Sequence, residues 1–122
     1  MRYYQTDCLK ETGFSLIKPI TIKEAKTFLK SLIKVIEMKR TFIKVNKLPP
    51  GFDIAVGIKQ SCIYFGYWGE NSFIRILICS CKDYDEKKVK KYIEEYFNTK
   101  VLMKVLTYTS VLEEEKKLCG KN

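Results

Sequence analysis

Histidine is absent from this chain of 122 residues. A zinc site built from Cys and His is therefore excluded, and no imidazole is present to act as a general acid or base near neutral pH. The five cysteines are odd in number and form no CxxC pair, so we expect neither a closed disulfide framework nor a metal site. Reduced thiols in a cytoplasmic protein are the simplest expectation.

Long apolar runs, glycine and proline are also scarce. The run Ile76–Cys79 is far shorter than the roughly 20 residues that cross a bilayer, and residues 1–7 lack the pattern of a secretion signal. With 46% hydrophobic residues, six Gly and three Pro, the composition excludes a collagen-like or low-complexity chain. These features predict a single folded domain over residues 1–122, cytoplasmic and without a membrane partner.

Acidic residues are the minority among the charged ones: 14 against 23 basic residues give a net charge of +9. Such a balance attracts anionic partners at long range. The only arginines are Arg2, Arg40 and Arg75, so few side chains could grip a base or phosphate with two parallel hydrogen bonds. The lysines alternate with glutamates, which favours a solvated basic surface. A basic nucleic-acid-binding module stays open as an alternative.

Apolar periodicity predicts two helices. Thr21 and Glu24 match a capping box, and the apolar residues that recur at helical spacing after them predict a helix over 21–39. Asp83 with Glu86 marks the start of a second helix. The apolar face of that helix is expected to consist of Val89, Tyr92, Ile93, Tyr96 and Phe97.

Alternating apolar residues predict an antiparallel sheet. Strand patterns occur at 14–17, 41–48, 52–58, 61–67, 72–81 and 101–105. Three antiparallel strands in succession are expected over 52–81, and the predicted element order is β-α-β-β-β-α-β, which counts one strand fewer than these six patterns. Two helices with one apolar stripe each, beside a sheet with one apolar face, pack as an α+β two-layer sandwich with both helices on one face of the sheet.

Residues 60–70, with the sequence Gln-Ser-Cys-Ile-Tyr-Phe-Gly-Tyr-Trp-Gly-Glu, resemble the ESHxSxHTWPE signature of short prokaryotic S-adenosylmethionine decarboxylases. The signature residues that this chain keeps are Ser61, Ile63, Trp68 and Glu70. The similarity continues without a gap, so that Cys81 falls on the Cys at the end of that family's next strand. It spans roughly residues 21–107.

The resemblance implies a self-processing, pyruvoyl-dependent enzyme of polyamine synthesis that forms a two-fold dimer. In such proenzymes the Ser hydroxyl attacks the preceding carbonyl, here that of Gln60, and the ester then eliminates to leave a pyruvoyl group. By position, Ser61 is the precursor and a catalytic residue, and Cys81 is the proton donor. Trp68 and Glu70 either line the substrate pocket, as the resemblance implies, or only shape a turn.

The departures from the signature remove most of the proton-transfer groups. The family His that assists processing falls on Gly66, the His beside the nucleophile on Cys62, and the preceding Glu on Gln60. Losing general-base help typically slows such a step by about 10²- to 10⁴-fold. Asp53, Tyr64 or Tyr67 could in principle substitute.

We therefore expect a diverged member of the family that stays unprocessed and is weakly active or inactive. It would bind an adenosyl or amine metabolite or serve as a regulatory paralogue, and would pair with itself or with an active paralogue. A pyruvoyl cofactor is expected only if cleavage before Ser61 occurs, and otherwise none. The alternative is an active decarboxylase of S-adenosylmethionine or arginine.

Overall fold

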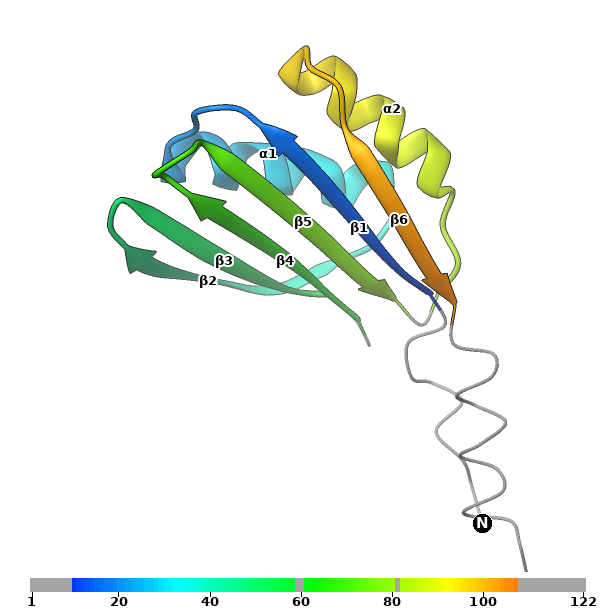
Figure 1. The fold of residues 1–122 in the computed structure, drawn as a ribbon. Helices are drawn as coiled ribbons and strands as arrows, with labels where there is room; N and C mark the ends of the chain where they lie inside the picture. Colours follow the sequence, from blue (N-terminus) through cyan, green and yellow to red (C-terminus); the bar gives the residue numbers. More distant parts are fainter. Residues whose placement is uncertain (1–9, 59–60, 81, 108–122) are drawn as a thin grey trace, which may run out of the picture.

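The computed structural model describes residues 10–58, 61–80 and 82–107. Within these ranges the chain forms six strands and two helices (Figure 1). The elements are β1 (Lys10–Ile17), α1 (Ile22–Val35), β2 (Arg40–Leu48), β3 (Gly51–Ile58), β4 (Ser61–Trp68), β5 (Phe73–Ser80), α2 (Glu86–Phe97) and β6 (Leu102–Thr107). Four strands lie between the helices, one more than the predicted element order counts, although all four segments were themselves predicted as strands.

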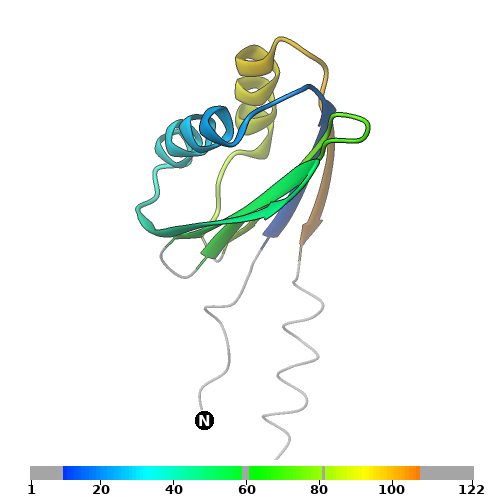
Figure 2. The same cartoon turned by 90° about the vertical axis from the view of Figure 1, so that its left-hand side faces the viewer.

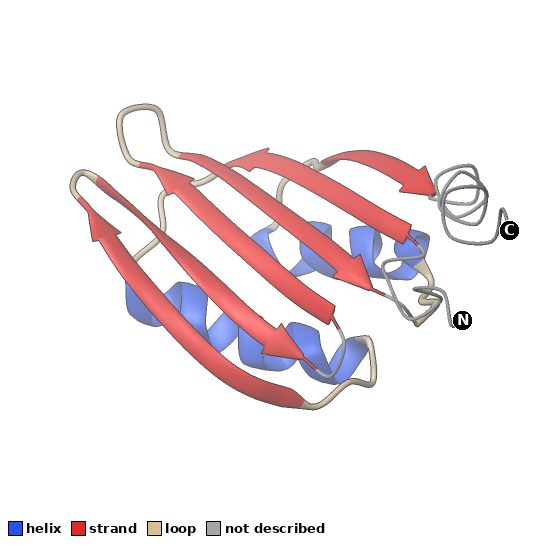
Figure 3. Cartoon of the chain, turned by 90° about the horizontal axis from the view of Figure 1, so that it is seen from below, coloured by secondary structure: helices blue, strands red, loops and turns tan. Residues whose placement is uncertain are grey.

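The strands form a single sheet in the order β2-β3-β4-β5-β1-β6, and every neighbouring pair is antiparallel. Both helices lie on one face of the sheet (Figure 2). The view in Figure 3 shows the same two layers, with the strands in front of the helices. The predicted two-layer sandwich is therefore confirmed.

The core lies between the helices and the sheet, because alternate side chains of each strand point toward the helices. Phe28 of α1 is fully buried at its centre, with its ring 6.2 Å from that of Phe65 in β4 and 4.8 Å from that of Phe97 in α2. Other fully buried core residues are Phe14, Leu29, Leu32, Ile54, Val56, Ile63, Ile74, Ile76, Ile78 and Ile93. Burial of large aromatic and branched side chains supplies most of the stabilisation of such a layer.

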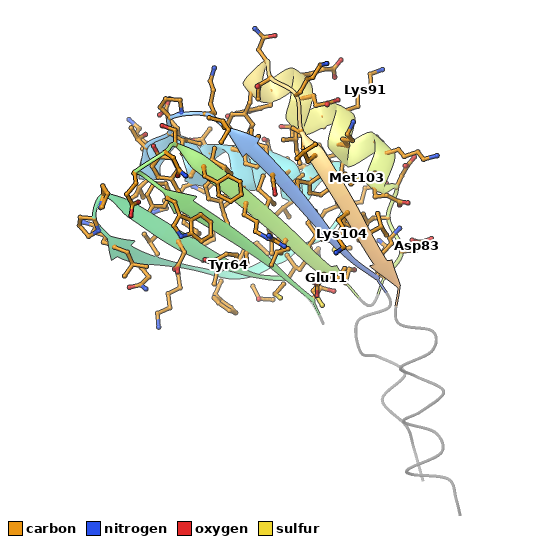
Figure 4. All side chains as sticks on the ribbon, in the orientation of Figure 1. Glu11, Tyr64, Asp83, Lys91, Met103 and Lys104 are labelled. Atoms are coloured by element: carbon orange, nitrogen blue, oxygen red, sulfur yellow. The ribbon has the colours of Figure 1, made fainter. Side chains whose placement is uncertain are left out.

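The opposite face of the sheet, called the open face below, is not covered by any helix of the described ranges. Its outward side chains include Glu11, Ile17, Lys44, Leu48, Cys62, Tyr64, Trp68, Phe73, Arg75, Cys79, Leu102 and Lys104. Figure 4 shows Glu11, Tyr64 and Lys104 on this side. A sheet with one face packed and the other outward is the usual arrangement for an antiparallel sheet.

The start of α1 is the predicted one, whereas the start of α2 is not. Thr21 and Glu24 form a complete capping box, with hydrogen bonds of 2.9 and 3.2 Å. In α2 the N-cap is Asp85, whose carboxylate accepts hydrogen bonds from two backbone N–H groups of the first turn. The prediction that Asp83 opens this helix was therefore wrong, and Asp83 instead forms an ion pair with Lys10.

The apolar face of α2 is narrower than predicted. Val89, Ile93 and Phe97 are buried, and Tyr92 is partly buried. Tyr96 is 43% exposed, although the edge of its ring packs on Phe28. It lies at the rim of the helix layer, so its assignment to the core was wrong.

Candidate functional site

Ser61, the predicted nucleophile, is the first residue of β4 and lies directly opposite Ser80, the last residue of β5. Its hydroxyl donates a hydrogen bond to Ser80 Oγ at 3.2 Å. Ser80 is fully buried on the helix-covered face; its hydroxyl donates to the Lys82 carbonyl at 2.6 Å and accepts from the Lys82 N–H at 3.0 Å. Ser80 therefore connects the candidate nucleophile to the turn that follows β5.

Two predicted site residues, Gln60 and Cys81, lie outside the described residues. Ser80 and Lys82, the neighbours of position 81 in the chain, belong to the hydrogen-bonded group at Ser61.

A lysine that sequence reasoning did not select lies next to this group. Lys10 of β1 is opposite Ser80 on the other side of β5, and its side chain is only 11% exposed. Its Nζ atom lies 2.7 Å from a carboxylate oxygen of Asp83 and 2.7 Å from one of Glu86. It also donates a hydrogen bond to the Tyr84 carbonyl and sits over the Tyr84 ring, 4.4 Å from its centroid. Figure 4 marks Asp83 at this end of the molecule.

These contacts keep Lys10 in its charged form. Burial alone would lower the pKa of Lys10, but the hydrogen bonds and charges of Asp83 and Glu86 outweigh it, and the pKa is raised. The hydrogen bond from Lys10 is in turn the largest cause that lowers the pKa of Asp83 and of Glu86. Lys10 is therefore an ammonium that ties the start of α2 to β1, and not a general base.

The other predicted residues line a separate cavity of about 220 Å³ at the opposite end of β4. It is lined by Leu48, Pro49, Pro50, Gly51, Phe52, Asp53, Tyr64, Tyr67, Trp68 and Glu70. Trp68 is 42% exposed. Burial, and then the charge of Asp53 and a hydrogen bond with it, raise the pKa of Tyr64. The cavity thus combines aromatic rings, a neutral phenol and two carboxylates.

Gly66, which the resemblance described above aligns with a processing His, lies beneath two of these rings. A Cβ atom at this position would lie 2.8 Å from the Tyr64 hydroxyl and 3.0 Å from the end of the Trp68 ring. Both distances are shorter than ordinary van der Waals contact. The rings of Tyr64 and Trp68 therefore fill the space that a larger side chain at position 66 would need.

Within one chain, Ser61 lies far from the cavity that Trp68 and Glu70 line. Ser61 and Trp68 are the first and last of the eight residues of β4, which places them roughly 24 Å apart at about 3.4 Å per residue. Their side chains also point to opposite faces of the sheet. One small ligand bound to one chain cannot contact both groups.

A larger hollow of about 410 Å³ lies away from both groups, between the start of α1 and the end of α2. Lys18, Lys23 and Tyr96 are among its lining residues. Over residues 10–58, 61–80 and 82–107, no cluster of three or more Cys, Asp or Glu side chains is arranged to hold a metal ion. In the same ranges no helix is both long and apolar enough to cross a membrane.

Ser80 and Lys10 are the residues that sequence reasoning missed. Ser80 carries a weak signal, because it is a polar residue in register with the buried isoleucines of β5. Lys10 carries none, because it precedes both the predicted first strand and the segment that resembles a known family.

Comparison with known proteins agrees with the fold described above and with the family resemblance seen in the sequence. The sequence profile of the S-adenosylmethionine decarboxylase family matches residues 20–107, which is most of the chain. No curated protein matches the chain in sequence. Among solved structures, an adenosylmethionine decarboxylase from Aquifex aeolicus superposes with a TM-score of 0.66 at 14% identity, over 83% of this chain and 91% of that one. The chain therefore belongs to the S-adenosylmethionine decarboxylase family.

Proposed function

We propose that this chain is an unprocessed member of its family, with weak or no decarboxylase activity, that binds a cationic adenosyl or amine metabolite. The observation that carries the proposal is the cavity at the end of β4, where Trp68 and Tyr64 lie beside the carboxylates of Asp53 and Glu70. The groups around Ser61 support the lack of processing.

Attack by the Ser61 hydroxyl on the preceding carbonyl requires removal of its proton. The hydroxyl donates to Ser80, a neutral alcohol whose own proton is directed at the Lys82 carbonyl. Lys10, nearby on β1, is held as an ammonium by two carboxylates. Neither group is a base, and the chain has no imidazole. General-base help is worth about 10²- to 10⁴-fold, so the absence of every histidine is expected to slow cleavage by about that factor.

A pyruvoyl group formed from Ser61 would supply the electron sink for decarboxylation. Ser61 has the side chain that such a precursor needs, but the described groups beside it do not fit its formation. We therefore assign no step to this cofactor.

The cavity suits a positively charged ligand with an aromatic or alkyl part. The face of Trp68 attracts a cation, and Asp53 and Glu70 complement its charge. At about 220 Å³ it is smaller than the roughly 300–1,000 Å³ of a site that encloses a whole drug-sized ligand. We infer that it holds one end of the metabolite, either the base or the amine.

Cleavage is tested by intact mass. Purified chain is incubated at 37 °C for several days beside Ser61→Ala, which cannot cleave. We expect a single mass for the uncut chain in both samples. Fragments 1–60 and 61–122 in the wild type only, with a carbonyl-reactive start on the second, would contradict the proposal and favour the active decarboxylase.

Ligand binding is tested by calorimetric titration with S-adenosylmethionine and, separately, with spermidine. Glu70→Gln removes one carboxylate and should weaken binding by about tenfold. Glu95→Gln, on the exposed side of α2, removes the same charge away from the cavity and should leave affinity unchanged. Equal weakening by both variants would mean that the attraction comes from overall charge, and no binding of either compound would overturn the proposed function.

We also propose that the chain forms a homodimer through one end of its open face. An apolar row crosses the sheet there, in which Trp68 is opposite Phe73 and Phe73 is opposite Ile17. Ile17 and Trp68 are 59% and 42% exposed, and Leu102 nearby on β6 is 77% exposed. Exposed apolar residues gathered in one patch are typical of a protein interface. Pairing with an active paralogue would use the same patch.

A further inference from the structure

We propose that the hollow between α1 and α2 binds a small phosphate monoester that carries an aromatic ring, such as a nucleoside monophosphate. Its volume of about 410 Å³ lies within the roughly 300–1,000 Å³ of pockets that hold small molecules. The hollow is part of the helix layer, on the other side of the sheet from the open face, so the proposed dimer contact does not cover it. The lining residues that carry the proposal are Lys18, Lys23, Glu24, Tyr96, Phe97 and Asn98.

The hollow forms where the start of one helix meets the end of the other. The capping box at Thr21 begins α1 and sets Lys23 in its first turn. Asn98 ends α2 in the left-handed conformation, with φ 52° and ψ 50°, which Asn adopts more readily than most residues. These two local signals bring Lys23 of α1 and Tyr96 of α2 to the same hollow.

Two ammonium groups at the hollow are available to an anion. Among the residues that the structure describes, neither Lys18 nor Lys23 forms an ion pair, in contrast to Lys10 and Lys90. A lysine binds a phosphate as a point charge, whereas recognition of a planar carboxylate by two parallel hydrogen bonds favours arginine. None of the described lining residues is an arginine. The donors at this hollow therefore favour a phosphate.

One carboxylate, that of Glu24, also lines the hollow, so two lysines against one glutamate leave one net positive charge. Its Oε1 atom accepts a hydrogen bond from the Thr21 N–H at 2.9 Å, and this contact is the largest cause that lowers the pKa of Glu24. The carboxylate is thus held at the helix cap and not by either lysine. It repels a bare anion but accepts hydrogen bonds from hydroxyl groups, which favours a phosphate that is attached to a sugar.

Tyr96 supplies a surface for the aromatic part of the ligand. Its ring packs on Phe28 and on Phe97, with centroid distances of 5.0 and 5.1 Å, and the residue is still 43% exposed. Burial, and then the charges of Tyr92 and Glu24, raise the pKa of Tyr96, so its phenol is neutral at pH 7 and does not repel an anion. Aromatic side chains of this kind are the surfaces on which nucleobases stack.

The hollow shares no lining residue with the cavity at the end of β4, which is suited to a cation. The inference therefore does not depend on the proposed function, and either one can fail without the other.

Calorimetric titration of the full chain with adenosine 5′-monophosphate tests the proposal. We expect saturable binding that is at least about tenfold tighter than that of adenosine or of inorganic phosphate, because each of these lacks one of the two contacts. Lys18→Gln and Lys23→Gln should each weaken binding of the nucleotide by about tenfold. Tyr96→Leu should weaken it similarly, because it removes the ring that the base contacts.

Lys34→Gln is the matched control. Lys34 is exposed in the last turn of α1, at the other end of that helix from the hollow, so this variant removes the same charge and should keep the affinity of the wild type. Circular dichroism checks that each variant is folded.

The proposal would be overturned by a chain that does not bind adenosine 5′-monophosphate, or that binds adenosine as tightly. Equal weakening by Lys23→Gln and Lys34→Gln would mean that overall charge attracts the nucleotide. Unchanged affinity in Lys18→Gln, Lys23→Gln and Tyr96→Leu would place the nucleotide elsewhere on the chain. Either result would also overturn the proposal.

Discussion

At the scale of single residues, the Lys10 ammonium has the densest set of polar contacts in the described part of the chain. Its Nζ atom contacts the carboxylates of Asp83 and Glu86, the Tyr84 carbonyl and the Tyr84 ring. Tyr84 in turn donates a hydrogen bond to Thr12 at 2.5 Å, so β1 holds the turn before α2 at two points. A charge this deeply buried is costly unless it is paired, so removal of one partner exposes that cost.

Lys10→Met tests this role. The variant keeps the alkyl chain but leaves two carboxylates without their cation, and we expect it to lower the free energy of unfolding at pH 7 by about 1–3 kcal/mol in urea denaturation. Lys90→Met is the control, because Lys90 forms an outer helical pair with Glu94 at 3.4 Å, and it should cost about 0.5 kcal/mol or less.

The pH dependence of the Lys10 effect follows from the shifted carboxyl groups. Lys10 lowers the pKa of Asp83 and Glu86, so the unfolded state binds more protons than the native state in acid. The stability that they add is complete above their ordinary pKa and is lost as the pH falls through the lowered values. The pKa of Lys10 is raised, so its own contribution persists at neutral pH and is lost only in strong alkali. The difference between wild type and Lys10→Met should therefore shrink from pH 7 to pH 3, and an unchanged difference would contradict the ion pairing.

At the scale of elements, the parts predictable from sequence are those fixed by local chemistry. The capping box of α1 and the alternation in β3, β4 and β5 depend on residues close together in the chain, and the structure confirms them. The start of α2 was misassigned because Asp83 and Asp85 are both acceptable N-caps. The choice is made by Lys10, which is distant in sequence and binds Asp83.

The site was predictable only in part, because it too depends on contacts between residues that are distant in sequence. The signature segment identified Ser61, Trp68 and Glu70, but a motif that runs along one strand places its two ends at opposite ends of that strand. Register between strands, which brings Ser80 to Ser61 and Cys79 to Cys62, depends on pairing that a single strand does not encode.

At the scale of the whole molecule, the separation of Ser61 from Trp68 bears on assembly. The helices of residues 10–58, 61–80 and 82–107 cover one face of the sheet, the other face exposes an apolar row at one end, and a two-fold contact through that row would bury the same residues twice. A stable interface buries about 1,600 Å² in total, which needs more than the row alone, so the flanking Leu48 and Leu102 must take part.

Sedimentation velocity over a range of concentrations checks this assembly. We expect the wild type to be a dimer at micromolar concentration. Ile17→Glu places a charge in the centre of the proposed contact and should raise the dissociation constant at least about tenfold, because an unpaired carboxylate would lose its hydration there. Thr27→Glu, on the exposed side of α1, adds the same charge on the other side of the molecule and should remain dimeric. A wild type that is monomeric throughout, or an Ile17→Glu variant that still forms dimers as readily, would show that this row is not the interface.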